Sequence, residues 1–538
     1  MSTEVFESHI TLNPTFHRLP VELLDHILSN MERPCLLNMM TVNRVIFHLA
    51  IKFAWYEVRG IDKVLKLLQY TTLPYSNNMY DSGKAIVLGE PSMEYHLVEN
   101  IPEAALGRVS MYGSNIVILH AHDSALNAIF HGLSVLLTMG PVTPHLRKLI
   151  LYPRDLPPAP FCTEVSFLLD LCGPDTLTAF YFARRRNRPM ERGRNHLPLI
   201  STSELTGVLC KLQSKQIRDL SLGLDYYFVS TTVQGGQQQL DSCLGELTTI
   251  YLFSSALPVV PLNLLARLPH LSSLTLTFSQ NMIEPLPSAL DGHTFPSLAC
   301  IKLSHAEYKA ATRLLSILPA QLQVVYLSFR QSDDDDEVPE LVNTLARHRQ
   351  TLESLALNLG SNITLNDICI STLSGLQQLT KFAAVLRFPN QHTMLRLFRN
   401  WPGIKHLHLP DCPIDPEGLV ELAMIWPHLT SMSVKLSMLH TPLAPAFGQQ
   451  NKTSYTNNEG FKLESAYSLS SPSISTASPR LSLQTDLDFD LDKCREVACL
   501  LVGCWKNVAL SEHPAPKLQA TILKRIKNEI EIFRGVAG

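Results

Sequence analysis

The chain has 538 residues, of which 45% are hydrophobic, and its 45 basic residues nearly balance its 48 acidic ones to give a net charge of −3. A chain this long and this apolar can bury a large core, so several domains or one array of repeats are expected. A charge balance so close to neutral gives no field that would favour nucleic acid or an anionic membrane, and neither is expected as a partner.

The first ten residues, MSTEVFESHI, contain no basic region followed by an apolar run. No stretch of the chain reaches the roughly 18 apolar residues of a membrane span. We therefore expect the protein in the cytoplasm, the nucleus or both. The 11 cysteines include no CxxC pair, and their odd number predicts reduced thiols rather than a disulfide framework.

Residues 19–55 predict three short helices. Pro20 stands where a helix has its first turn and where a missing N–H costs nothing, so the first helix is expected to start there. Its apolar residues recur at helical spacing, namely Leu23, Leu24, Ile27, Leu28 and Met31. The second helix carries Leu36 and Leu37, and the third follows Arg44. Because about 40 residues form only a marginal core, contacts with a partner or a neighbouring domain are expected to complete this unit.

The same segment resembles an F-box, the motif that docks substrate receptors onto the Skp-type adaptor of SCF ubiquitin ligases. The resemblance rests on the Leu-Pro opening, the apolar spacing and Trp55 at the end. Asn43 departs from it, since many members have cysteine there. Carried over residue by residue, the resemblance implies adaptor contacts from Leu19, Pro20, Leu23, Ile27, Leu28 and Leu36. The alternative is that these helices only cap the larger domain behind them.

From Leu146 onward one pattern returns: apolar, two variable, apolar, one variable, apolar, then a loop and an apolar helical stretch. The clearest copies begin at Leu146, Ile217, Leu247, Leu271, Leu298, Leu322, Leu352, Ile404 and Leu429. Weaker copies begin at Leu177 and Leu379, and the segments from Lys84 and Asn115 are expected to form two irregular first strands. From Leu247 on the copies lie roughly 25 residues apart, which is a repeat spacing rather than chance alternation.

Prolines provide a second sign of the repeat. Each of Pro144, Pro269, Pro296, Pro402 and Pro427 stands two residues before the first apolar position of a copy. Proline disfavours the helical state in the residue before it, so each repeat is predicted to run from helix to stop to strand. Cys412 matches the Asn or Cys that leucine-rich repeats place after the strand.

The long middle of the chain therefore resembles a leucine-rich repeat, which implies an α/β solenoid with parallel strands on a concave face and helices on the convex face. A non-repeating α/β domain is the alternative. We expect the F-box over residues 14–58 and the solenoid, with irregular first repeats, over 59–445. A disordered insertion rich in Ser, Thr and Asn is expected over 446–490. A C-terminal helical cap is expected over 491–538, since Leu518, Ile522, Ile526 and Ile530 lie four apart.

No sequence pattern supports an enzyme, because phosphate-binding glycine loops, HExxH and GxSxG are all missing. No cofactor or catalytic residue is expected, and His406 with His408 lack the further ligands of a metal site. On the predicted strands the side chains facing the concave surface include weak candidates for substrate binding: Tyr251, Phe253, Tyr326, His406 and His408. Tyr152, Tyr181, Lys302 and Lys381 share that face. The basic run from Ala183 to His196 favours a solvated insertion over an import signal.

Together the two resemblances imply a substrate-recognition subunit of an SCF ubiquitin ligase. Its F-box would bind the Skp-type adaptor and through it a cullin, while the repeats would bind a protein substrate whose identity the sequence leaves open. The alternative function is a leucine-rich-repeat interaction scaffold without a role in ubiquitin transfer.

Overall fold

The computed structural model describes residues 19–61, 63–64, 67, 71–72, 95–96, 103–122, 140–152, 161–173, 175–182, 199–213, 215–222, 227–229, 244–257, 260–278, 295–319, 321–330, 335–360, 362–436, 480–485, 494, 497–498, 501–502, 509–510, 522 and 524–532. The chain forms two compact units, Met1–Leu264 and Leu265–Gly538. We call them unit 1 and unit 2 and describe each by itself.

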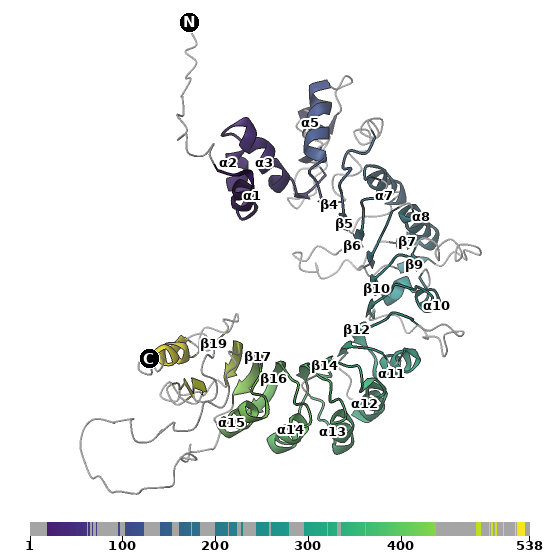
Figure 1. The fold of residues 1–538 in the computed structure, drawn as a ribbon. Helices are drawn as coiled ribbons and strands as arrows, with labels where there is room; N and C mark the ends of the chain where they lie inside the picture. Colours follow the sequence, from purple (N-terminus) through teal and green to yellow (C-terminus); the bar gives the residue numbers. More distant parts are fainter. Residues whose placement is uncertain are drawn as a thin grey trace, which may run out of the picture. The chain divides into compact units, whose positions relative to one another are not determined.

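Unit 1 begins with helices and continues as strands alternating with helices (Figure 1). In chain order the elements are α1 (Val21–Ser29), α2 (Arg33–Met39), α3 (Arg44–Ala54), β1 (Glu57–Arg59), β2 (Thr71–Thr72), β3 (Tyr95–His96), α5 (Glu103–Gly113), β4 (Ile118–His122), β5 (Lys148–Tyr152), α7 (Phe161–Asp170), β6 (Ala179–Phe182), β7 (Leu199–Ser201), α8 (Thr202–Leu212), β8 (Asp219–Leu222), β9 (Tyr227–Val229) and β10 (Thr249–Phe253), followed by η4 (Ser254–Ala256) and α10 (Leu262–Leu265) at the division.

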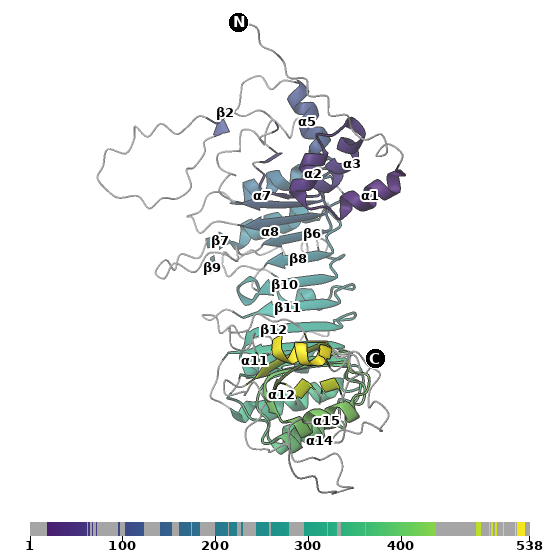
Figure 2. The ribbon, with the colours of Figure 1, turned by 90° about the vertical axis from the view of Figure 1, so that its left-hand side faces the viewer.

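The main sheet of unit 1 is parallel and has the strand order β1-β4-β5-β6-β8-β10. Figure 2 shows β6, β8 and β10 stacked one after another. Each strand therefore pairs with the next main strand of the chain, as expected of a repeat. Two small pairs stand apart from this order, β2 with β3 and β7 with β9.

Unit 2 continues the same alternation. Its elements are β11 (Ser273–Thr277), β12 (Cys300–Ala306), α11 (Tyr308–Ile317), β13 (Val324–Phe329), η5 (Asp335–Glu337), α12 (Val338–Leu345), η6 (Ala346–His348), β14 (Ser354–Asn358), α13 (Asp367–Leu373), β15 (Lys381–Val385), α14 (Gln391–Phe398), β16 (His406–Ile414), α15 (Pro416–Ile425), β17 (Ser431–Leu436), β18 (Arg480–Thr485) and β19 (Ala509–Leu510). Its parallel sheet runs from β11 to β19 in unbroken chain order.

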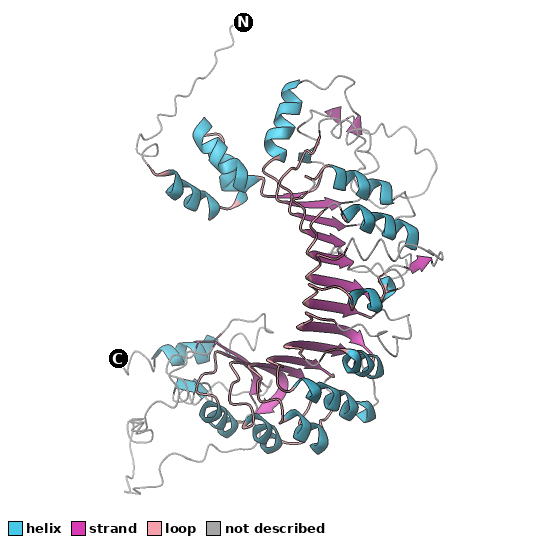
Figure 3. Ribbon diagram, turned by 45° about the vertical axis from the view of Figure 1, so that its right-hand side comes forward, coloured by secondary structure: helices cyan, strands magenta, loops and turns pink. Residues whose placement is uncertain are grey.

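In each unit the helices that connect successive strands lie on one side of the sheet (Figure 3). We call the opposite side the open face. The alternation of leucines along each strand explains this arrangement, because a period of two sends them all to the helix side. Leu355 and Leu357 of β14 are buried, whereas Ser354, Ala356 and Asn358 between them are partly exposed. The first apolar position of each predicted copy, from Leu146 to Leu429, is also buried. The predicted leucine-rich-repeat solenoid is confirmed in this architecture.

Aromatic side chains join successive repeats inside unit 2. Trp401 and Trp426 are fully buried and follow α14 and α15. The indole N–H of Trp426 donates to the backbone oxygen of Trp401 at 2.6 Å, and that of Trp401 donates to the backbone oxygen of Leu373 at 3.1 Å. The ring of Phe398 lies 5.8 Å from that of Trp401 and 5.0 Å from that of Trp426. Each tryptophan thus satisfies a carbonyl of the preceding repeat while filling its core.

Cys412 also joins two repeats. Its thiol donates to the backbone oxygen of Leu386 at 3.2 Å, and burial raises the pKa of Cys412 to about 12. The thiol is therefore kept neutral. The repeat pattern predicts Cys412 just after a strand, whereas in the structure it lies within β16, where the pairing with β17 shifts register between Leu409 and Pro413.

The structure differs from the sequence prediction in three places. The first main strand is β1, directly after the third helix and partly inside the range predicted as F-box. The sequence does not predict β1, because its three residues are too few to show the alternation of apolar and polar side chains that marks a strand. The strand expected from Asn115 begins at Ile118. The predicted disordered insertion is wrong at its end, because Arg480–Thr485 form β18, whose Leu481 and Leu483 align with Met432 and Val434 of β17.

Other predictions are only partly covered by the described residues. Near the C-terminus Ile522, Ile526 and Ile530 are buried along a helical stretch, while Lys524 and Lys527 are exposed. This stretch is amphipathic, as predicted for the cap. The strand expected from Lys84, the basic run Ala183–His196, most of the predicted insertion and Leu518 lie outside the described residues.

Candidate functional site

The three N-terminal helices pack around a small apolar core. Leu28 of α1, Leu36 of α2, and Ala50 and Ala54 of α3 form its buried centre. Partly buried side chains surround it, namely Met31, Met39, Met40, Leu49, Phe53 and Trp55. A charged pair adds to the packing, since the ammonium of Lys52 on α3 donates to the Asp25 carboxylate on α1 at 2.5 Å. The segment thus folds into one compact helical unit.

Residues outside the core set the ends of these helices. The carbonyl of Pro20 accepts hydrogen bonds from the amides of Leu23 and Leu24, both at 3.1 Å, so the first helix starts where the sequence predicts. The side chain of Asn43 accepts from the amide of Ile46 at 2.8 Å and caps the start of α3. The capping bond gives a physical reason for Asn43, the position that departs from the F-box pattern.

Several large apolar side chains of these helices remain exposed. Leu23 is 50% exposed and Ile27 43% exposed, and their spacing of four places them on one face of α1. Val21, Leu37 and Val45 are also exposed, so each of the three helices contributes at least one apolar side chain to the surface. Exposed apolar side chains that gather on one small unit are typical of a binding surface.

The predicted adaptor contacts divide into two groups in the structure. Pro20, Leu23 and Ile27 are exposed and Leu19 is partly exposed, so these side chains are available to a partner. Leu28 and Leu36 are 1% and 4% exposed and pack in the helical core. The apolar stripe in the sequence does not distinguish the two groups, because Ile27 and Leu28 are neighbours of the same residue class.

The helical unit is attached to the first repeat by aromatic packing within unit 1. The ring of Tyr112 on α5 lies 4.7 Å from the ring of Trp55 and 6.2 Å from the ring of Phe47. Directly after Trp55, the backbone carbonyl of Tyr56 accepts hydrogen bonds from the backbone amides of Val117 and Ile118. These bonds start the pairing of β1 with β4. The repeat side therefore completes the small core, as its size predicted.

The open face of unit 1 carries a polar network at its first strands. On β4, His120 lies with Nε2 3.1 Å from the Glu57 carboxylate and with Nδ1 3.0 Å from the Tyr152 hydroxyl. The Arg59 guanidinium donates to the same carboxylate at 2.8 Å. Because Glu57 and Tyr152 occupy both ring nitrogens, this network is internally satisfied and holds the first strands together.

His120→Gln is expected to flatten the pH dependence of stability. Burial is the main cause that lowers the pKa of His120 below 6.5, and Arg59 and Lys148 add to it, while Glu57 opposes it. The unfolded chain therefore binds more protons below pH 6.5, and this stability is lost as the pH falls through that window. Glu57, whose pKa is lowered chiefly by the hydrogen bond from Arg59, acts in the same direction at lower pH.

The measurement compares urea midpoints of the parent and the variant at about pH 7.5 and about pH 5.5. The parent should lose more stability on acidification than the variant. An equal loss in both proteins would show that His120 is not a source of the dependence.

Further along the open face of unit 1, one aromatic ring contacts a lysine ammonium and two other rings contact each other. The Lys148 ammonium lies 4.4 Å from the ring centre of Tyr181. Tyr251 and Phe253 meet edge to face with ring centres 6.0 Å apart. The structure thus brings these two predicted residues together, with both side chains partly exposed.

The open face of unit 2 holds the remaining candidates in two rows of paired residues. One row runs through Lys302, Tyr326, Ala356, Ala383 and His408, and the neighbouring row includes Lys381, His406 and Ser431. Tyr326, Lys302, Lys381 and His408 are exposed, and His406 is partly exposed with Nδ1 2.8 Å from the Ser431 hydroxyl. The predicted residues therefore do share one face.

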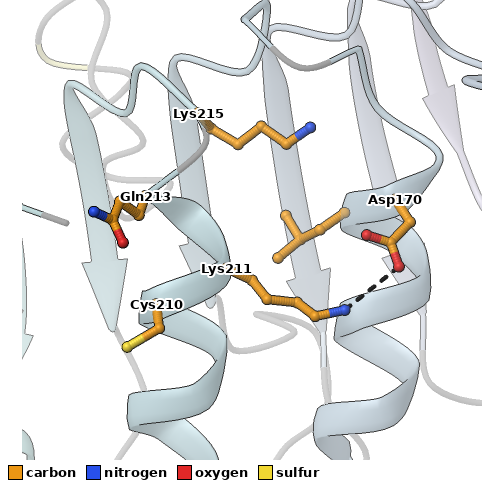
Figure 4. A pocket seen from close by; sticks show the side chains of 6 residues that line it. Asp170, Cys210, Lys211, Gln213 and Lys215 are labelled. Carbon is orange, nitrogen blue, oxygen red and sulfur yellow. Dashed lines mark hydrogen bonds and ion pairs between the residues drawn. The ribbon is translucent and has the colours of Figure 1, made fainter. Parts of the chain in front are cut away.

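A shallow pocket of about 380 Å³ lies between the ends of α7 and α8, lined by Leu169, Asp170, Cys210, Lys211, Gln213 and Lys215 (Figure 4). The Lys211 ammonium lies 3.4 Å from the Asp170 carboxylate. That of Lys215 donates to the carbonyls of Cys172 and Gly173 just after α7, which is a helix-capping role. These contacts explain the polar lining by packing between repeats.

Over the ranges given above, no group of three or more His, Cys, Asp or Glu side chains could hold a metal ion. Within the same ranges, no helix is both long enough and apolar enough to cross a membrane.

Glu57, Arg59 and His120 were missed at the level of sequence. The alternation of Glu57 and Arg59 directly after Trp55 was the available signal, but it covers only three residues. His120 follows an apolar run that predicted a strand, although the run did not show which partners would pair with it.

No protein-family model matches the chain, and no curated protein matches it. Among solved structures, an internalin from Listeria monocytogenes strain 4b F2365 is 13% identical to this chain, with a TM-score of 0.31. The match covers 66% of this chain and 93% of the internalin chain. A TLR13–ssRNA13 complex is 15% identical with a TM-score of 0.30; the match covers 64% of this chain but only 43% of the TLR13 chain. The repeat fold described here rests on the strand order and register of the chain itself.

Proposed function

We propose that the chain is a substrate receptor of an SCF-type ubiquitin ligase, in which α1, α2 and α3 dock a Skp-type adaptor and the repeats bind a protein substrate. The observation that carries this proposal is the exposure of Leu23 and Ile27 on a compact three-helix unit whose sequence resembles an F-box. The function would need no catalytic residue in this chain.

Energetics support a partner on this surface. Leaving a leucine or isoleucine side chain half in water forgoes part of the roughly 1.5–3 kcal/mol that full burial contributes. Val21, Leu37 and Val45 are exposed in addition to the pair on α1. A protein that covered these side chains would recover that stabilisation, so the surface suits an apolar docking contact.

In the proposed mechanism the receptor acts by proximity. It would hold the substrate near a ubiquitin-charged enzyme, which raises the effective concentration of substrate lysines. The chemistry of ubiquitin transfer would belong to other subunits of the ligase, reached through the adaptor and a cullin.

A second candidate function is an interaction scaffold in which the helices only close the end of the repeat array. The packing of Trp55 and Phe47 against Tyr112 favours it, because an integral cap needs such contacts. Both functions share the repeat surface as the site of partner binding. They differ only in whether the adaptor binds.

Co-purification tests the proposal. The full chain, co-expressed with a Skp-type adaptor, should retain the adaptor through affinity purification and gel filtration. Leu19→Ala with Pro20→Ala should weaken this retention, since both side chains are at least partly exposed at the start of α1. Failure of the intact chain to retain the adaptor would leave the scaffold function as the better account.

A further inference from the structure

The open face of unit 2 is basic. Lys302 on β12, Lys381 on β15 and His406 on β16 all lie at strand positions that face away from the helices. Lys405 stands just before β16, and its side chain is exposed. Burial together with the charges of Lys381 and Lys405 lowers the pKa of His406, which agrees with a local excess of positive charge.

The lysines of this face lack acidic partners in the described part of unit 2. No ion pair is formed there by Lys302, Lys381 or Lys405. Among the exposed carboxylates, Glu353 stands just before β14, Glu307 follows β12, and Asp411 lies within β16. By contrast, Lys309 on the helix side pairs with Glu337 at 2.8 Å. Among the described residues of unit 2, the charges of Lys302, Lys381 and Lys405 are therefore not paired with a carboxylate.

Between Lys302 and Lys381 the open face carries short side chains and one exposed aromatic ring. Tyr326 pairs in register with Lys302 and is 39% exposed. The next residues of the same row are Ala356 and Ala383, whose short side chains let a backbone approach the sheet. An exposed tyrosine beside small residues offers contact area with a polar tip.

We propose that the open face of unit 2 binds a carboxylate-rich segment of a partner protein, with Lys302 and Lys381 receiving its acidic side chains and Tyr326 packing against it between them. The inference rests on the proposed function in one respect, since it names the class of partner that the repeats would read. Charge complementarity is the reason for this class, because an acidic segment would supply the counter-charge that the face lacks.

The spacing of the strands indicates how such a segment would fit. Lys302 and Lys381 lie three strands apart, about 14 Å at roughly 4.8 Å per strand, and are offset by two residues along the strands, about 6.6 Å. The backbone positions are thus about 16 Å apart, and because an extended peptide rises about 3.3 Å per residue, carboxylates about five residues apart would reach both lysines. A peptide with Glu at this interval and Ser or Leu between is the natural probe.

A nucleic acid fits these observations less well. Its binding surfaces combine a dense basic stripe with several stacking aromatics, whereas this face offers separated lysines and Tyr326. The chain as a whole carries a net charge of −3, which opposes a general polyanion site.

The test measures binding of the fluorescein-labelled acidic peptide to the full chain by anisotropy. Lys302→Glu with Lys381→Glu should weaken binding at least about tenfold, and added salt should weaken binding to the parent. Arg313→Glu with Arg349→Glu is the matched control, because it makes the same charge change at exposed residues outside the open face. The control should bind the peptide nearly as well as the parent.

Three results would overturn the inference. The first is that the parent shows no saturable binding of the acidic peptide. The second is that the parent and the Lys302/Lys381 variant bind the peptide equally well. The third is that a single-stranded oligonucleotide binds the same residues more tightly than the peptide, which would indicate a nucleic-acid site.

Adaptor retention by the parent and by the Lys302/Lys381 variant is measured in parallel. If the parent retains the adaptor but does not bind the peptide, this inference alone is refuted. If the parent binds the peptide but does not retain the adaptor, the proposed function alone is refuted.

Discussion

Trp401→Ala is expected to destabilise unit 2 by about 3–5 kcal/mol, the usual cost of emptying a large aromatic from a packed core. Trp401 is fully buried, and its ring centre lies 4.7 Å from that of Phe382. Its indole N–H also donates to the carbonyl of Leu373, so truncation leaves that carbonyl without this donor. In a repeat array each unit contacts only its neighbours, so the damage should centre on the repeats around α14.

Urea unfolding followed by circular dichroism measures this effect without depending on the tryptophan signal. Trp401→Phe should cost less, because it keeps most of the apolar volume and loses mainly the hydrogen bond. Met424→Ala is the surface control, since Met424 is 59% exposed, and it should change stability by no more than about 0.5 kcal/mol. A loss below about 1 kcal/mol for Trp401→Ala would show that the aromatic stack is not a main source of stability.

Leu23→Asp combined with Ile27→Asp is expected to weaken binding of the Skp-type adaptor by at least about a hundredfold. Each side chain buried in a complex contributes about 1.5–3 kcal/mol, and 1.4 kcal/mol corresponds to a factor of ten. A carboxylate placed in such a contact would also be desolvated without a partner. The fold should survive, since both positions are exposed and Leu28 remains in the core.

Surface plasmon resonance with immobilised adaptor provides the affinity, and the circular dichroism spectrum checks the fold. Ile368→Asp is the matched control, because Ile368 on α13 is 63% exposed and lies far along the chain from the helical unit. It should bind the adaptor like the parent. Equal affinity of the Leu23/Ile27 variant and this control would exclude the exposed face of α1 from the contact.

The repeat architecture could be predicted because its signal is spread over many copies. A leucine at the same place in each copy must be buried, and the alternation that follows sends its neighbours to opposite faces. The prediction was wrong where the signal was short or mixed. Glu57–Arg59 offers three residues, and Arg480–Thr485 follows a stretch rich in serine that predicted disorder.

The tryptophan contacts between repeats show a signal that was present but not used. Trp401 and Trp426 each directly precede one of the prolines that end a helix, at a repeat's distance from one another. The recurrence of Trp-Pro could have predicted a shared position in the core. Its hydrogen bonds to the preceding repeat could not be predicted, because they depend on how the repeats stack.

The sequence could predict where along the chain the candidate adaptor-binding site lies, but not which of its side chains are exposed. The helical stripe of α1 contains buried Leu24 and Leu28 beside exposed Leu23 and Ile27. Which side faces the core is decided by α3, and the one-dimensional pattern does not contain that packing. The same holds for His120, whose partners Glu57 and Tyr152 come from β1 and β5.

Hydroxyl-radical footprinting of the full chain, with and without saturating Skp-type adaptor, tests the central proposal most directly, because it reads side-chain accessibility without any mutation. Oxidation of Leu23 and Ile27 should fall sharply in the presence of adaptor, while Ile368 and Met424 should be oxidised as before. Unchanged oxidation of Leu23 and Ile27 at adaptor saturation would contradict the proposal.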